Sequence, residues 1–129
     1  MAQRSLRWFI ALFGLVCVAI ALAHIFIGPA AIPGAIPVNP TMDSEDRFYA
    51  TLFLGFGAAH VWAAQDLQAR RAVVLALQAV FFAGGIARIV SWVSVGPPAP
   101  LFIFLGSLEL VIPLLLWLAL RQMNHAPDN

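Results

Sequence analysis

The sequence predicts an all-α protein, a four-helix transmembrane bundle that forms one domain over residues 1–129 with both termini in the cytoplasm. Hydrophobic residues make up 62% of the chain and charged residues only 10%, whereas ordinary soluble domains carry about 25% charged residues. Four separate apolar stretches approach the length of about 20 residues that a helix needs to cross a bilayer. The Arg residues outside these stretches fall mainly in segments that would share one side of the membrane.

The four helices are expected over residues 8–27, 46–65, 71–95 and 100–121. The first follows two Arg residues, as a signal sequence would, but its apolar stretch of about 20 residues exceeds the 7–15 typical of a signal peptide. We therefore expect a retained helix. The second has the shortest apolar stretch, and either Asp43 or Ser44 is expected to cap its first turn. The segment between the third and fourth helices is short, which predicts that these two are antiparallel neighbours.

The segment 28–42 between the first two helices contains Pro29, Pro33, Pro37 and Pro40. Proline at this density opposes a helix and favours an extended or turning path. The sequence predicts an outer loop here, either a cap over the helices or a plain connector.

The orientation follows from the distribution of Arg in the short connecting segments. One side carries Arg4, Arg7, Arg70, Arg71 and Arg121. Cytoplasmic segments are enriched in basic residues, so this side is predicted to be cytoplasmic and residues 28–42 and 96–100 to lie outside.

Two ionisable residues fall inside predicted spans, where every backbone group is already hydrogen-bonded and a charge is costly. Arg88 precedes the outer turn between the third and fourth helices by about nine residues, and Glu109 follows it by about twelve. In an antiparallel hairpin these depths differ by roughly 4–5 Å. We therefore expect a charge-assisted contact between Arg88 and Glu109.

Further polar residues share the predicted outer half of the membrane. We take the candidate binding cluster to comprise His24, Glu45, Arg47, Arg88, Ser91 and Glu109. Two interpretations stay open: a salt-bridge network that fixes the register of the helices, or a polar cavity that holds a lipid headgroup, a quinone or another amphiphile, or relays a proton. Buried ion pairs are weak evidence for a purely structural role.

Other functional classes find little support in the sequence. It shows no catalytic motif, no metal-ligand pattern and no sign of a cofactor, and His24 and His60 are too far apart in depth to share an ion. The lone Cys17 is expected to pack as a small apolar side chain, and no basic stripe suggests nucleic acid. Small residues, among them Gly55, Gly57 and Gly84, predict close helix packing and a surface for a homo-oligomer.

The polar motifs resemble a known family. Residues 45–50 (EDRFYA) and 54–57 (LGFG), residues 84–91 (GGIARIVS) with Gly96 and Pro97, and residues 108–111 (LELV) resemble, in order and spacing, the family called domain of unknown function 4345. The resemblance implies a small four-helix membrane protein of bacterial type, hence a multi-pass protein of the bacterial plasma membrane. By fold the chain also resembles the broader DoxX-like group.

The expected function is that of a non-enzymatic accessory or scaffold protein whose outer cluster binds membrane lipid or another membrane protein. The alternative is a small quinone- or lipid-handling enzyme or carrier. In that case Glu109 or Glu45 would exchange protons and Arg88 would hold an anionic or carbonyl oxygen.

Overall fold

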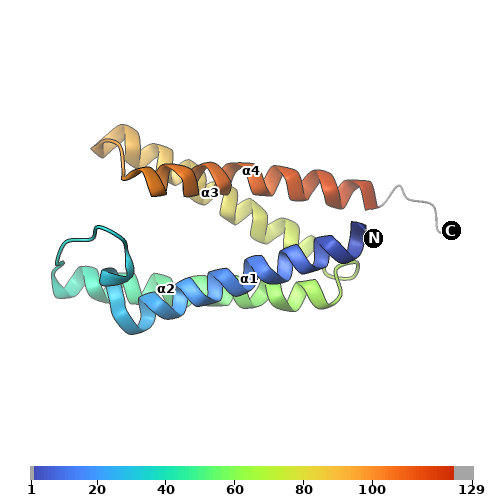
Figure 1. Cartoon of the computed structure of the whole chain (residues 1–129), viewed down its shortest axis with the longest axis horizontal. Helices are drawn as coiled ribbons and strands as arrows, with labels where there is room; N and C mark the ends of the chain where they lie inside the picture. The colour runs from blue at the N-terminus through green and yellow to red at the C-terminus, as the bar shows by residue number, and fades with distance from the viewer. Residues whose placement is uncertain (1, 124–129) are drawn as a thin grey trace. The chain divides into compact units, whose positions relative to one another are not determined.

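The computed structural model describes residues 2–123 and contains four long helices (Figure 1). In chain order the elements are α1 (Ala2–Ile27), the 3-10 helix η1 (Gly28–Ala31), α2 (Pro40–Gln65), α3 (Arg71–Val95) and α4 (Pro100–Met123). No strand occurs within the described residues. The all-α prediction is confirmed, and the start and end predicted for the third helix coincide with those of α3.

Helix α2 begins six residues before its predicted start at residue 46, and its cap differs from the expected one. The side chain of Asn39 accepts a hydrogen bond of 2.9 Å from the backbone N–H of Met42, while Pro40 occupies the first turn. Proline suits this position because its fixed φ is helical and its missing N–H would have no partner there. The prediction that Asp43 or Ser44 caps the helix is therefore wrong. The predicted loop 28–42 is also shorter, because η1 takes its first four residues and α2 its last three.

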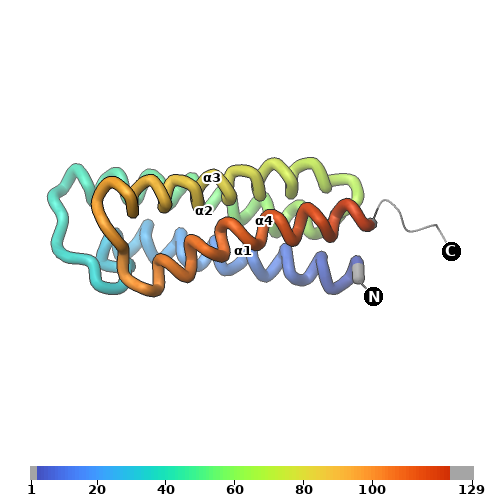
Figure 2. The backbone as a smooth tube through the Cα atoms, turned by 90° about the horizontal axis from the view of Figure 1, so that it is seen from above, coloured from blue at the N-terminus to red at the C-terminus, as the bar shows by residue number. Residues whose placement is uncertain are grey.

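The chain divides into two compact units, residues 1–70 and 71–129. Each contains a helical hairpin, α1 with α2 in the first and α3 with α4 in the second. Figure 2 shows the chain reversing its direction between the two helices of each hairpin. The combination of both hairpins into one bundle and one domain stays a prediction.

The backbones of α1 and α2 approach each other closely at a pair of glycines. A Cβ atom on Gly57 would lie 2.7 Å from the carbonyl oxygen of Gly14, and one on Gly14 would lie 2.6 Å from that of Gly57. Such distances leave no room for any side chain, so this crossing requires both glycines. The prediction that Gly55 and Gly57 allow close packing is confirmed for Gly57 and wrong for Gly55, which faces open space.

A second close contact joins α3 and α4. A Cβ atom on Gly85 would lie 2.7 Å from Cδ2 of Leu110, while the same atom on Gly84 would meet nothing closer than 3.9 Å. Of these two adjacent glycines, Gly85 therefore packs closely against α4, and Gly84 does not.

Three of the helices are long and apolar enough to cross a membrane: residues 3–31, 71–95 and 100–122. Only 17–22% of their most apolar windows is buried inside the protein. Large apolar side chains that face outward over whole helices indicate a lipid environment, because water would penalise such a surface. The chain is therefore consistent with an integral membrane protein.

Helix α2 is not among these three, although it is 26 residues long. Its first turns carry four charged side chains, from Asp43 to Arg47. The apolar part that remains, residues 48–64, spans only about 26 Å, slightly less than the hydrocarbon layer. The fourth crossing, and with it the cytoplasmic location of both termini, stays a prediction.

Candidate functional site

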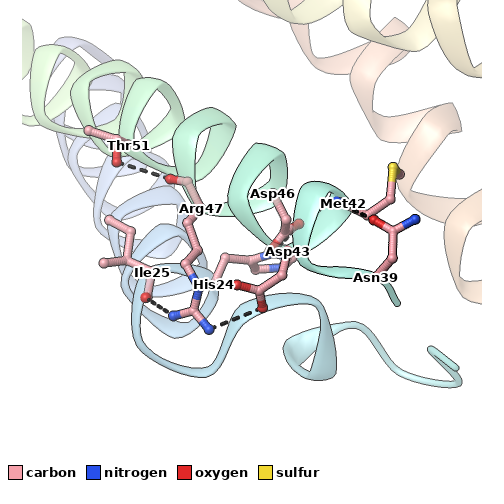
Figure 3. Close-up of polar contacts among 8 residues, drawn as sticks. All are labelled: His24, Ile25, Asn39, Met42, Asp43, Asp46, Arg47 and Thr51. Carbon is pink, nitrogen blue, oxygen red and sulfur yellow. Dashed lines mark hydrogen bonds and ion pairs between the residues drawn. The ribbon is translucent and has the colours of Figure 1, made fainter. Parts of the chain in front are cut away.

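Four of the predicted polar residues make contacts, and these contacts form one cluster within each hairpin. The first lies where α1 ends and α2 begins (Figure 3) and contains His24 and Arg47. The second contains Arg88 of α3 and Glu109 of α4.

The end of α1 is tied to α2 by a contact between His24 and Asp46, which the sequence did not predict. Nδ1 of His24 lies 3.0 and 3.1 Å from the two carboxylate oxygens of Asp46, and both side chains are about 20% exposed. Asp46 shares a helical stripe with Ala50 and Gly57, four and eleven residues further on, and both of these are buried. This spacing in the sequence could have indicated that Asp46 faces α1. The adjacent Glu45 is rotated about 100° around the helix axis and therefore faces away.

Arg47 connects the start of α2 to the last turn of α1. Its Nε and Nη2 donate to the two carboxylate oxygens of Asp43 at 2.8 and 3.2 Å, and its Nη1 donates to the carbonyl oxygen of Ile25 at 2.6 Å. The guanidinium therefore satisfies one of the carbonyls left open at the end of α1. The hydrogen bonds from Arg47 lower the pKa of Asp43 below its ordinary value.

Gly28 completes this corner of the first hairpin. Its φ of +73° lies in the left-handed region, and a Cβ atom there would be 2.7 Å from Oδ1 of Asp43 and 2.8 Å from Nη2 of Arg47. The conformation and the close approach both require glycine. The Pro-rich segment thus starts with a turn that packs directly on the Asp43–Arg47 pair.

Two members of the predicted cluster take no part in these contacts. Glu45 and Ser91 are exposed, and neither makes a hydrogen bond or ion pair with the residues that the structure describes. The predicted joining of Glu45 and Arg47 with Arg88 and Glu109 in one network stays a prediction. The partners found for Arg47 belong to its own hairpin.

The second hairpin contains the predicted contact between Arg88 and Glu109. Nε of Arg88 donates to Oε2 of Glu109 at 2.7 Å. Glu109 is only 8% exposed, whereas the Arg88 side chain is 42% exposed. Arg88 lies seven residues, or about 10 Å, before the end of α3. The contact is confirmed, and it holds a buried carboxylate between α3 and α4.

Only one edge of the Arg88 guanidinium is used by Glu109. Gly106 gives its stem room, since a Cβ atom there would lie 3.2 Å from Cδ of Arg88, and the ring of Phe102 lies 5.9 Å from the guanidinium carbon. No described residue forms a hydrogen bond with Nη1 or Nη2. These two groups are the donors that the hairpin leaves available.

His60 has a packing role. It is fully buried in the core, its Nδ1 lies 2.9 Å from the carbonyl oxygen of Phe56, and its ring lies 5.0 Å from that of Phe13. Within residues 2–123, no three His, Cys, Asp or Glu side chains gather as a metal site would require.

A third feature lies at the opposite end of the first hairpin, where α1 begins and α2 ends. An open groove of about 590 Å³ lies between the two helices there. Arg7 donates from Nε to the carbonyl oxygen of Ala64 at 2.9 Å and from Nη2 to that of Gln65 at 2.7 Å. Nearby, the guanidinium of Arg70 lies 4.1 Å from the ring centre of Trp62. In the sequence these Arg residues indicate the orientation of the helices but do not predict a groove.

The comparisons with known proteins agree with the resemblance carried by the polar motifs. No curated protein and no solved structure matches the chain. The DoxX-like resemblance stays a prediction. The family described as domain of unknown function (DUF4345) matches residues 5–120, a range that covers most of α1, both polar clusters and most of α4. The chain belongs to this family.

Proposed function

We propose that the protein is a non-enzymatic accessory or scaffold subunit of the bacterial plasma membrane. In this proposal Arg88 binds an oxygen-bearing group of a partner membrane protein or a lipid. The observation that carries the proposal is the unequal burial of the Arg88–Glu109 pair: the side chain of Glu109 is buried, whereas the side chain of Arg88 is 42% exposed.

The energetics favour a role beyond stability. Replacing a buried ion pair with apolar side chains is often neutral or stabilising, so packing alone gives no reason to keep these charges. A guanidinium at this depth in an apolar layer is costly unless acceptors surround it. Nη1 and Nη2 of Arg88 can hold a carboxylate, phosphate or carbonyl oxygen, and Glu109 fixes their direction through Nε.

Glu45 and Ser91 fit the same proposal as exposed contacts of the partner. Both side chains are accessible, and neither is used within its own hairpin. Charged and hydroxyl groups at the rim of an interface contribute more to the choice of partner than to affinity.

The test separates a structural pair from a binding pair. The double variant Arg88→Met with Glu109→Leu removes both charges and keeps similar volumes. We expect it to fold with nearly unchanged thermal stability in detergent, but to lose the proteins or lipids that co-purify with the wild type. Arg121→Gln, which alters an exposed Arg on the same hairpin, should retain them. Unchanged co-purification by the double variant would refute the proposal.

A second candidate function is favoured by the geometry of His24. Asp46 holds Nδ1, which leaves Nε2 of His24 without a hydrogen bond from any described residue. An oriented imidazole with one open nitrogen is suited to proton transfer. This supports the alternative of a quinone- or lipid-handling enzyme or carrier, with His24 as the proton-exchanging group in addition to Glu109 or Glu45.

A short-chain ubiquinone tests the second candidate. Binding can be followed by quenching of Trp fluorescence in the purified protein. The alternative predicts saturable binding that His24→Asn and Arg88→Gln both weaken and that Arg121→Gln leaves unchanged. Quenching that rises linearly with quinone, or that is equal in all variants, would dismiss it.

A further inference from the structure

We propose that the groove between the start of α1 and the end of α2 binds the phosphate headgroup of an anionic phospholipid. The groove lies in the first hairpin and shares no residue with the Arg88–Glu109 pair, so this inference goes beyond the function proposed above.

The charge of the groove favours an anion. Its lining contains Arg4 and Arg7 and no acidic residue. Arg4 is exposed and makes no hydrogen bond or ion pair within the described part of the chain. Its charge is therefore not neutralised by a described protein group.

Arg7 is already held in place. Its Nε and Nη2 donate to the two carbonyl oxygens at the end of α2, which leaves Nη1 as its remaining donor group. A side chain fixed by its own protein loses little conformational freedom when it binds a ligand. Arg4 and Nη1 of Arg7 can together supply donors to the non-ester oxygens of a phosphodiester.

The depth of the groove matches that of a headgroup. The groove lies at the N-terminal end of α1, which is one of the helices long enough to cross the membrane. Trp8 lines it and is 67% exposed, and Trp at the end of a membrane helix lies at the level of the glycerol and phosphate groups. A lipid is therefore the source of phosphate at this position, and the ring of Trp8 can cover its glycerol backbone.

The shape of the groove comes from small residues. Ala11 and Val61 line it beside Ala64, which is buried. Longer side chains at these positions would fill the space between the helices. The resulting volume of about 590 Å³ is in the range of small-molecule sites, and its apolar floor suits the upper part of an acyl chain.

The experiment titrates the purified full chain in mild detergent with short-chain phosphatidylglycerol, short-chain phosphatidylcholine and inorganic phosphate. The wild type should bind phosphatidylglycerol in preference to phosphatidylcholine. Arg4→Gln should weaken that binding about tenfold, the effect expected from losing one charge-assisted hydrogen bond. Ala11→Leu should weaken it as well, because it narrows the groove without changing any charge. Arg121→Gln is the matched control and should bind like the wild type.

Three outcomes would overturn the inference. Equal affinity for the two lipids would indicate a general detergent-like association. Equal effects of Arg4→Gln and Arg121→Gln would assign the preference to overall charge. Competition by inorganic phosphate at the concentrations at which the lipid itself binds would assign the groove to a free ion and not to a lipid.

Discussion

Asp43 and Arg47 show how a residue pair can hold the corner of a hairpin. Arg47 donates to both carboxylate oxygens of Asp43 and to the last turn of α1, and Gly28 packs against both side chains. The pair therefore couples the turn after α1 to the first turn of α2. The carboxylate also lies near the positive end of the α2 dipole, which favours its charged form.

Acidification should lower the free energy of unfolding, because protonation of Asp43 removes its ionic contact with Arg47. The hydrogen bonds from Arg47 lower the folded-state pKa of Asp43 below the ordinary value of 3.8. Its contribution to stability is therefore fully present above that value and is lost as the pH falls through the lowered pKa. We expect the wild type to lose more unfolding free energy on acidification than Asp43→Asn, as followed by thermal unfolding in detergent. Parallel pH profiles for the two proteins would contradict the assignment.

For single residues, the sequence predicted the depth of a side chain along its helix better than its direction around the helix axis. The Arg88–Glu109 contact could be predicted because a short outer turn fixes the depth of both residues in an antiparallel hairpin. The depth of a residue does not distinguish Asp46, which contacts His24, from its neighbour Glu45, which does not. Neighbouring residues share a depth but differ by about 100° in direction, and only the packing against α1 decides which of them faces His24.

Among the elements, the crossing of α1 and α2 rests on contact between two glycines. The carbonyl oxygen of Gly14 occupies the space in which a Gly57 side chain would lie, and the reverse also holds. The helices cannot approach as they do with any larger residue at either position.

Two substitutions two residues apart on α2 test this crossing. Gly57→Ala should destabilise the protein by about 1–3 kcal/mol, because the added methyl group forces the backbones apart. Gly55→Ala meets nothing within 4 Å and should be neutral or slightly stabilising through its helix propensity. Thermal unfolding in the same detergent measures both. Equal destabilisation by the two would indicate that glycine serves flexibility here and not close approach.

The ends of a helix could be predicted only where an apolar stretch is bounded directly by charged residues or by glycine and proline. The boundaries of α3 follow from Arg71 at one end and the Gly96–Pro97 pair at the other. The start of α2 was placed too late because its first turns are polar, although Asn39 and Pro40 carry an ordinary capping signal. Gly14 and the groove could not be foreseen, because both depend on which faces of α1 and α2 meet.

On the scale of the whole molecule, the chain combines outward-facing apolar helices with few charges. The three helices that qualify as spans leave most of their apolar windows unburied, which is consistent with an integral membrane protein. Two of the carboxylates have partners within their own hairpin: Asp46 contacts His24, and Glu109 pairs with Arg88. Pairing reduces the cost of placing such groups in an apolar layer.

Charged and aromatic residues at the ends of the helices support the predicted orientation in the membrane. Arg70 lies over Trp62 and Arg121 over Trp117, with 4.1 and 4.6 Å from guanidinium to ring centre. Paired cationic and aromatic groups at helix ends are suited to the headgroup layer. They support the prediction that these ends, together with Arg4 and Arg7, lie on the cytoplasmic side.

The most direct test of the membrane topology is site-directed labelling of single cysteines in intact cells. Cys17→Ser removes the only native thiol, and Ala35→Cys or Gln68→Cys then adds one before or after α2. An impermeant maleimide should label Ala35→Cys from outside and should reach Gln68→Cys only after the membrane is permeabilised. Equal labelling of both positions in intact cells would mean that α2 does not cross the membrane, and would contradict the four-span account.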